Sequence, residues 1–299
     1  MIHLPNFLIV GAAKSGTTAL YHYLKQHPDI FLTPIKETNF FALDGVNIDF
    51  KGPGDSEGVH RKSITNITEY SNQFSEYKNE KAIGEICPLY LYSECAPKNI
   101  NQYVPNVKII AVLRDPVDRA FSAWLHLTRD KRESLSFDQA LNDESRRIKE
   151  NWAEIWHYRE QGMYYKQLSR YYDIFPKENI KVFFYNDFKN NPIKIYSEIC
   201  DFIGVNNTFN VNMDQNHNKG GIPRNRLLYN LMMHKNFIKT IFNFIIRGSL
   251  RKRIKVFLDK RNLTSLELDP AKKMKYKSFF KDDITELENL LNLRINHWK

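Results

Sequence analysis

Cysteine is scarce in this chain of 299 residues. Cys87, Cys95 and Cys200 are the three cysteines, and no two of them form a C-x-x-C pair. The odd count argues against a disulfide framework and predicts unreactive thiols in a reducing compartment. The first residues, MIHLP, lack the basic start of a secretory signal, and the apolar run that follows is too short to cross a membrane. We therefore expect a cytoplasmic protein.

Acidic residues are absent from one long segment. Between Gln215 and Leu258 there is no Asp or Glu, whereas ten Lys and Arg occur there, and this segment carries the whole net charge of +10. Such a block predicts a surface that meets anions. Apolar residues interleave with the basic ones from Leu227 to Leu258, so three interpretations stay open: a core helix with a basic rim, a groove for an anionic polysaccharide, or a face that contacts an anionic membrane. The last would place the protein peripherally at the inner membrane face. No nucleic-acid motif occurs, so nucleic acid is not a predicted partner.

Length and composition predict one large core. With 42% hydrophobic residues, the chain suits a single α/β domain over residues 1–299, with a basic amphipathic helical decoration at about 215–260. Strands alternating with helices predict a three-layer fold, a mostly parallel central sheet with helices on both faces. Predicted strands are 7–10, 30–32, 82–86, 108–113 and 180–184; predicted helices are 17–26, 117–129, 137–150, 163–174, 193–202 and a closing helix at 282–298. The Gly-rich stretch Asp44–Gly58 is expected to be a loop that contacts substrate.

A phosphate-binding loop is the most informative signal. Residues 7–20, FLIVGAAKSGTTAL, combine a buried strand, a Gly-containing turn and a helix start, which aims backbone N–H groups at an anion. The spacing of Gly11 and Gly16 nearly matches the ATP-binding loop G-x-x-x-x-G-K-[ST]. Thr17, however, stands where that motif has its lysine, and Lys14 is the only lysine of the loop. The loop therefore predicts a site for a phosphate-like anion rather than for a metal-bound triphosphate.

A second candidate phosphate site lies in KIIAVLRDPVDRAFSAW. The predicted strand ends in Arg114, and Ser122 lies eight residues further on. The strand-to-helix turn can bring both side chains to the carboxyl end of the sheet, where open α/β folds bind ligands. A guanidinium and a hydroxyl together suit a phosphate. The alternative is an ion pair of Arg114 with Asp115 or Asp118.

These two segments resemble the 5′-phosphosulfate loop and the 3′-phosphate site of sulfotransferases that use 3′-phosphoadenosine 5′-phosphosulfate (PAPS). The first family motif, K-x-G-T-[ST]-x-L, is matched by Lys14, Gly16, Thr17, Thr18 and Leu20, and the second, R-x₇-S, by Arg114 and Ser122. The segments HPDIFLTPIKETNFF, GEICPLYL, ESLSFDQAL and GMYYKQLSRYYDIFP resemble the carbohydrate-type and bacterial branch. The resemblance implies a P-loop-like fold, PAPS as donor, adenosine 3′,5′-bisphosphate (PAP) as product, no metal, and a carbohydrate or glycolipid acceptor.

The general base is predicted at Glu37. In the carbohydrate branch a glutamate before paired aromatics has this role, and Glu37 in KETNFF matches it. A sugar hydroxyl is a weak nucleophile, so a carboxylate that takes its proton assists the transfer. The alternative is a surface pair of Lys36 with Glu37. The phenol and steroid branch uses a histidine instead, and none of the nine histidines fits that pattern.

Three further acidic or basic residues have less specific sequence patterns. Glu85 ends a predicted strand and is either a substrate contact or a structural acceptor. Relatives often have a basic residue where this chain has Ile86, which weakens the case for a cationic contact to an acidic sugar. His126 and His157 are interpreted as surface or core histidines.

The resemblance also implies roles in transfer. Lys14 neutralises charge on the bridging oxygen, and the N–H groups of Ser15 to Thr18 with the Thr17 and Thr18 hydroxyls hold the 5′-phosphate. Arg114 and Ser122 hold the 3′-phosphate. Lys219 and Arg224, in HNKGGIPRNR, are predicted to close over the 3′-phosphate or the adenine. Two other classes stay open: a P-loop kinase, which lacks its lysine after Gly16, and an inactive nucleotide- or membrane-binding module.

Overall fold

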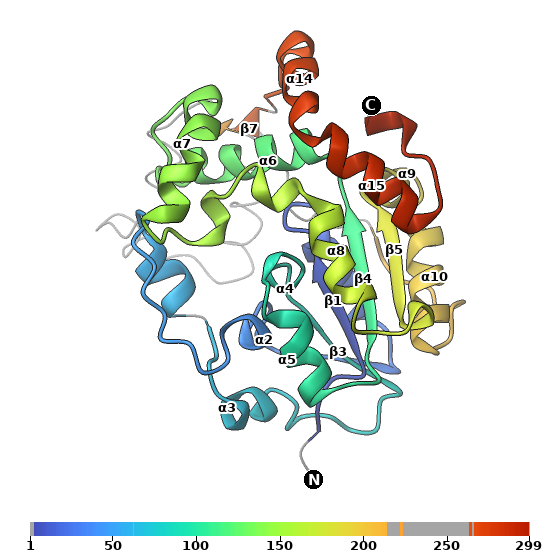
Figure 1. Cartoon of the computed structure of the whole chain (residues 1–299). Helices are drawn as coiled ribbons and strands as arrows, with labels where there is room; N and C mark the ends of the chain where they lie inside the picture. Colours follow the sequence, from blue (N-terminus) through green and yellow to red (C-terminus); the bar gives the residue numbers. More distant parts are fainter. Residues whose placement is uncertain (1–2, 62, 214–221, 224–262, 265, 299) are drawn as a thin grey trace, which may run out of the picture.

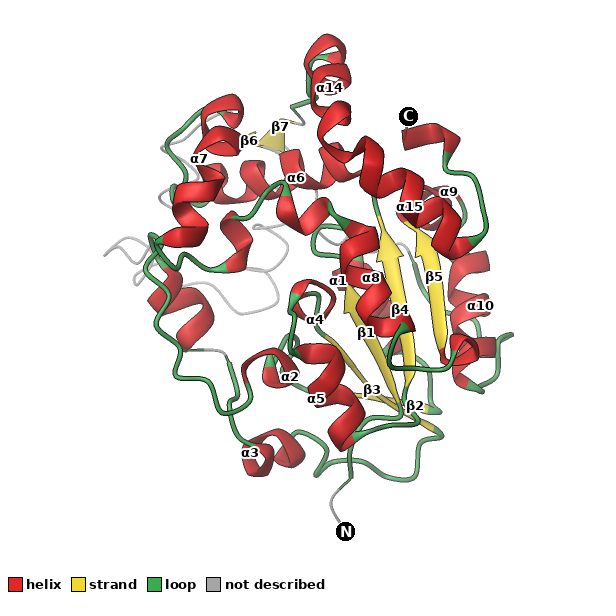
Figure 2. Ribbon diagram, in the orientation of Figure 1, coloured by secondary structure: helices red, strands yellow, loops and turns green. Residues whose placement is uncertain are grey.

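A five-stranded parallel sheet forms the centre of the computed structural model, which describes residues 3–61, 63–213, 222–223, 263–264 and 266–298. The strand order is β2-β3-β1-β4-β5, and each neighbouring pair is parallel. The carboxyl ends of the strands therefore meet at one edge (Figure 2). The strands are β1 (Phe7–Gly11), β2 (Ile30–Leu32), β3 (Ala82–Ile86), β4 (Lys108–Leu113) and β5 (Ile180–Phe184).

Both faces of the sheet are covered. Along β1, Leu8 and Val10 belong to one hydrophobic cluster, whereas Phe7 and Ile9 belong to another. Successive side chains of a strand point to opposite faces, so the two clusters are the two sides of the sheet. Figure 1 shows α4, α5 and α8 in front of the strands, and the second cluster packs α1 and α10 against the other face. This three-layer arrangement confirms the predicted α/β fold.

The predicted helices between the strands are present, and the structure adds short ones. Helix starts follow local chemistry: Asp115 accepts hydrogen bonds from Val117 N and Asp118 N, and Ser136 forms a capping box with Gln139. The helices are α1 (Thr17–Leu24), α2 (Phe40–Leu43), α3 (Ile67–Asn72), α4 (Leu89–Tyr92), α5 (Ala96–Tyr103), α6 (Pro116–Arg129), α7 (Phe137–Lys149), α8 (Tyr164–Tyr172), α9 (Tyr185–Asn190), α10 (Pro192–Ile203), α14 (Pro270–Lys277) and α15 (Lys281–Leu291). Single helical turns are η1 (Ser56–His60), η2 (Glu154–Trp156), η3 (Glu160–Gly162), η4 (Lys177–Asn179), η5 (Ser278–Phe280) and η6 (Asn296–Trp298).

The closing helix is shorter than predicted. It ends at Leu291 because Asn292 adopts a left-handed conformation, φ 50°, which a continuing α-helix does not contain. The chain then turns back, and Trp298 is buried against Tyr164 and Phe184. The prediction that this segment packs on the core is confirmed.

The predicted loop after Asp44 is tied down by one buried carboxylate. Asp55 accepts hydrogen bonds from Ala153 N at 2.9 Å and Trp156 Nε1 at 3.0 Å, and it forms an ion pair with Arg132. Gly52 lies so close to the Asp55 carboxylate that a Cβ there would be 2.3 Å from it. The loop and η2 therefore form one unit.

Most of the basic segment lies outside the described residues. Two short strands that pair antiparallel are described in and after it, β6 (Ile222–Pro223) and β7 (Leu263–Thr264). The predicted helical decoration at 215–260 and the residues Lys219 and Arg224 fall among the residues not described. Within the described part of the chain, no helix has both the length and the apolar character to cross a membrane.

Candidate active site

The loop after β1 forms an anion cradle. Gly16 caps α1 with φ 86°, and a Cβ on it would lie 2.9 Å from the ring of Phe188, so the turn requires glycine. No side chain among the described residues caps α1, and the first N–H of the helix that bonds within it is that of Ala19, which donates to the Gly16 carbonyl at 3.0 Å. Ser15 is fully buried, yet its hydroxyl has no partner within the described residues. Thr17 is also buried, and Thr18 is half-buried. Such a loop offers several donors to a bound phosphate.

Lys14 is the cation of this loop. It has a positive φ of 67°, and its carbonyl accepts a hydrogen bond of 3.0 Å from Arg114 Nη1. Burial, followed by the charges of Arg129 and Arg114, lowers the pKa of Lys14 to about 8. The Glu37 carboxylate acts in the opposite direction on the same pKa, so the two predicted catalytic residues lie within electrostatic reach of each other.

Arg114 is available to an anion. Its guanidinium stacks on the Tyr185 ring at 4.8 Å and forms no ion pair among the described residues. Asp115 is occupied in capping α6, and Asp118 pairs with Lys273 at 2.6 Å. The alternative in which Arg114 pairs with either aspartate is therefore wrong. Arg114 joins the first loop to the second predicted phosphate site.

Ser122 lies on α6 and is half-buried. β6, which follows directly after the segment that contains Lys219, packs beside α6. The helix that carries Ser122 therefore lies beside Ile222 and Pro223, the two described residues of the segment predicted to close over the nucleotide. The side chains of Lys219 and Arg224 themselves lie outside the described residues.

The backbone of Glu37 is held in place by the next residue, Thr38. The Glu37 side chain is 47% exposed and forms an ion pair with Lys36. Thr38 is buried and donates to Glu85 twice, from its N–H at 3.0 Å and its hydroxyl at 2.6 Å. Since Thr38 cannot move without breaking both bonds, the backbone of Glu37 is fixed. The alternative surface pair is present, and it leaves the carboxylate exposed.

Glu85 is a structural acceptor. It is fully buried on β3, and besides Thr38 it accepts hydrogen bonds from Tyr70 at 2.9 Å and Tyr90 at 2.8 Å. Burial raises its pKa, and these donors oppose the shift. Both carboxylate oxygens have donors and the side chain is fully buried, so of the two interpretations left open for Glu85 the geometry supports the structural one. Sequence alone does not show this because the donors come from three separate segments.

The last turn of α6 adds charges that the sequence motifs do not reveal. Arg129 Nη2 lies 2.6 Å from His126 Nδ1. Burial, and next the charge of Lys14, lowers the pKa of His126 to about 4. Ser122, His126 and Arg129 follow one another at intervals of four and three residues on one helix face, and this spacing is the signal that could have found them. His157, by contrast, is buried and hydrogen-bonded to Tyr92 at 2.8 Å, as expected of a core histidine.

Fold and site together define an α/β protein with a P-loop-like anion site at the carboxyl edge of a parallel sheet. Residues 4–219 match the sulfotransferase domain family, and the chain belongs to that family. It is 32% identical to the sulfotransferase from Alicyclobacillus acidocaldarius, whose crystal structure superposes with a TM-score of 0.79 over 99% of each chain. The predicted resemblance is thereby confirmed.

Two curated relatives extend this comparison. The chain is 28% identical over 151 residues to the membrane-associated sulfotransferase kil1 of Dictyostelium discoideum, covering 48% of this chain and 29% of that protein. It is 27% identical over 209 residues to human bifunctional heparan sulfate N-deacetylase/N-sulfotransferase 3, covering 68% of this chain and 22% of that protein. The chain thus spans less than a third of the length of either relative.

Proposed function

We propose that this protein transfers a sulfuryl group from PAPS to a hydroxyl of a carbohydrate or glycolipid. The observation that supports it most is the hydrogen bond from Arg114 to the Lys14 carbonyl, which places two anion receptors side by side. PAPS carries two phosphate groups on one nucleoside and so needs two such receptors. The unpartnered Ser15 hydroxyl and the crowded Gly16 fit an oxyanion held closely by the loop.

The proposed transfer is in-line and uses no metal. Lys14 and the N–H groups of Ser15 to Thr18 bind the 5′-phosphosulfate, and Arg114 with Ser122 binds the 3′-phosphate. Glu37 takes the acceptor proton as the new O–S bond forms and the bond from sulfur to the bridging oxygen breaks. Lys14 stabilises the negative charge that collects on that bridging oxygen. Lys219 and Arg224 belong to the same proposal as closing groups.

The nature of the acceptor rests on the relatives and on the site's exposure. The human relative is named for an activity on heparan sulfate, a carbohydrate, which supports a carbohydrate acceptor here. The exposed carboxylate of Glu37 is reachable by a large acceptor. Screening ³⁵S transfer from labelled PAPS to carbohydrate, lipid and phenol acceptors tests this, and transfer to phenols alone would contradict it.

Donor binding has a separate test. PAP without Mg²⁺ should raise the melting temperature, because a ligand at 100 times its Kd stabilises the folded state by about 2.7 kcal/mol. ATP with Mg²⁺ should raise it much less. A larger shift with Mg²⁺-ATP would favour the kinase alternative.

We also propose that the protein works in the cytoplasm, in peripheral contact with an anionic membrane. The basic composition of 227–258 and the name of the Dictyostelium relative support the contact. Charge reversal at Arg251, Lys252 and Arg253 should abolish salt-sensitive vesicle flotation and spare PAP binding. A wild-type protein that does not float with anionic vesicles at low salt contradicts the proposal.

A further inference from the structure

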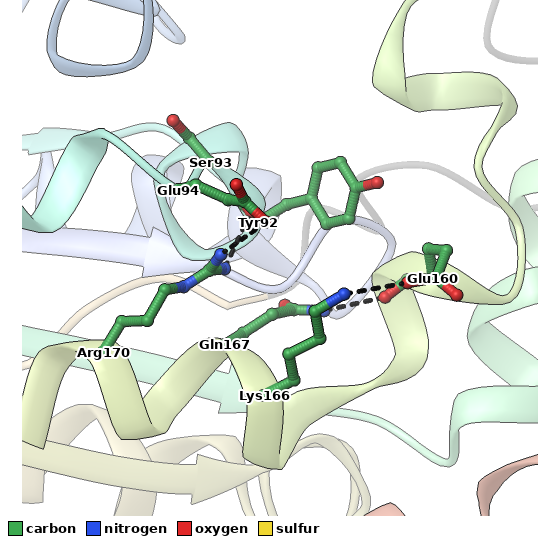
Figure 3. Close-up of a pocket in the computed structure, with 7 residues that line it drawn as sticks. All are labelled: Tyr92, Ser93, Glu94, Glu160, Lys166, Gln167 and Arg170. Carbon is green, nitrogen blue, oxygen red and sulfur yellow. Dashed lines mark hydrogen bonds and ion pairs between the residues drawn. The ribbon is translucent and has the colours of Figure 1, made fainter. Parts of the chain in front are cut away.

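A second cavity lies between α4 and α8. It has a volume of about 210 Å³ and is lined mostly by polar and charged side chains from the end of α4, η3 and α8. Figure 3 shows Lys166 and Arg170 extending from α8 toward Glu160 and toward Tyr92 and Glu94. None of the residues predicted for donor binding lines this α4–α8 pocket. It is therefore a site separate from the anion cradle.

The charges of the α4–α8 pocket balance. Lys166 Nζ lies 3.5 Å from Glu160, and Arg170 Nη1 lies 3.6 Å from Glu94, so both ion pairs are long. Long pairs of this kind leave hydrogen-bonding capacity on both the cations and the carboxylates. A polyanion gains little here, because two carboxylates oppose it as strongly as two cations attract it.

The pocket wall is fixed in place. Arg170 Nη2 donates to the carbonyl of Tyr92 at 2.9 Å, and the Arg170 Nε is buried without a partner among the described residues. Gln167 is buried and donates to the carbonyl of Glu160 at 3.0 Å. These bonds tie α4, η3 and α8 together and hold Arg170 and Gln167 in place for a ligand, whereas the Lys166 and Glu94 side chains are exposed.

A row of side chains links this pocket to Glu37. Tyr92 lines the pocket, and the charge of Glu154 is one of the causes that raise its pKa after burial. The charges of Asp55 and Glu37 likewise contribute, after burial, to raising the pKa of Glu154 to about 7. Hydrogen bonds connect the same segments. Tyr92 Oη lies 2.8 Å from His157 Nδ1, and His157 N donates to the Glu154 carbonyl at 2.9 Å. Thr38, which follows Glu37, and Tyr90, which lies on α4 with Tyr92, both donate to the Glu85 carboxylate. An acceptor whose hydroxyl meets Glu37 can therefore extend along α4 toward the pocket.

We propose that the α4–α8 pocket is an acceptor subsite that binds an uncharged sugar ring beyond the ring that is sulfated. Donors and acceptors set around a small polar cavity with an aromatic side chain in its wall suit a polyhydroxylated ring, and the balanced charge selects a neutral one. This inference rests on the proposed carbohydrate acceptor and adds where the acceptor extends and what charge it carries there.

The test titrates the full chain, with PAP present, against four tetrasaccharides: maltotetraose, cellotetraose, N-acetylated chitotetraose and a heparan sulfate tetrasaccharide. Binding is followed by saturation-transfer NMR. At least one neutral tetrasaccharide should bind more tightly than the heparan one. Glu160→Gln and Lys166→Met should each weaken that binding about tenfold, as expected for loss of a charged hydrogen-bond partner. Lys177→Met, which removes an exposed lysine beyond the far end of α8, is the matched control and should change nothing.

Several outcomes would overturn the subsite. They are no binding by any neutral tetrasaccharide, tightest binding by the heparan tetrasaccharide, or equal behaviour of the two pocket variants and the control. The PAP melting shift and ³⁵S transfer, measured on the same samples, keep the two proposals apart. If both succeed while the tetrasaccharides fail, the sulfotransferase function stands and the subsite is wrong. If PAP does not bind, the proposed function fails by itself.

Discussion

The lowered pKa of Lys14 makes donor binding depend on pH. With a pKa of about 8 in the free protein, Lys14 is about 90% charged at pH 7 and about 10% charged at pH 9. Bound phosphate favours the charged form and raises this pKa again, so binding must recharge the lysine. The affinity for PAP should therefore fall about tenfold between pH 7 and pH 9, because the charged fraction of Lys14 falls by about that factor. The phosphates add little, because their second pKa, about 6, lies below this range.

Isothermal titration calorimetry measures this directly. At pH 8, PAP binding should take up about half a proton, read from the difference in apparent enthalpy between HEPES and Tris buffers. Lys14→Arg is the control, because a guanidinium stays charged throughout this range, and the slope with pH should disappear. A wild-type affinity that is flat from pH 7 to pH 9, or proton release on binding, would refute the assignment of Lys14 to the phosphates.

Four other substitutions separate the roles of residues in and around the site. Arg114→Ala should weaken PAP binding by about 1.5–3 kcal/mol through loss of a charge-assisted contact, and calorimetry should show a smaller loss for adenosine 5′-monophosphate, which lacks the 3′-phosphate. Glu37→Gln should lower kcat about 10²–10⁴-fold with PAP affinity unchanged, and near wild-type turnover in this variant would exclude Glu37 as the base. Glu85→Gln should instead lower the free energy of unfolding by about 1–3 kcal/mol. Burial raises the pKa of Glu154 to about 7. Between about pH 4.5 and 7 the unfolded chain loses the Glu154 proton while the folded state keeps it, so the folded state loses stability as the pH rises. Glu154→Gln should therefore stabilise the protein by about 1–2 kcal/mol at pH 8 and little near pH 5. Urea unfolding at both pH values checks this, and equal effects at both would contradict it.

The sheet and its long helices were predictable because their signals are local. Strands such as Lys108–Leu113 are buried on both faces and appear as unbroken apolar runs. The short helices α2 and α4, FFAL and LYLY, gave no signal, because four apolar residues carry no periodicity. The end of the closing helix was missed since it depends on the left-handed conformation of a single asparagine, Asn292.

The candidate site was predictable only where one short segment carries a whole function. Lys14 and Arg114 stand in spaced motifs, and the structure brings them into contact. The role of Glu85 depends on hydrogen-bond donors from three separate segments. The α4–α8 pocket is formed by helices that lie more than seventy residues apart in the sequence. Such arrangements come from tertiary packing, which no local pattern encodes.

The anchoring of the loop after Asp44 has a consequence for how acceptor preference can change. Asp55 receives its bonds from Ala153 and Trp156, the residues on either side of the segment that presents Glu154. A different loop would therefore reposition Glu154 along the proposed acceptor path while leaving Lys14 and Arg114, which follow β1 and β4, where they are. Selectivity for the acceptor can therefore be altered by exchanging this loop, in nature or by engineering, while the residues proposed to bind the nucleotide keep their positions.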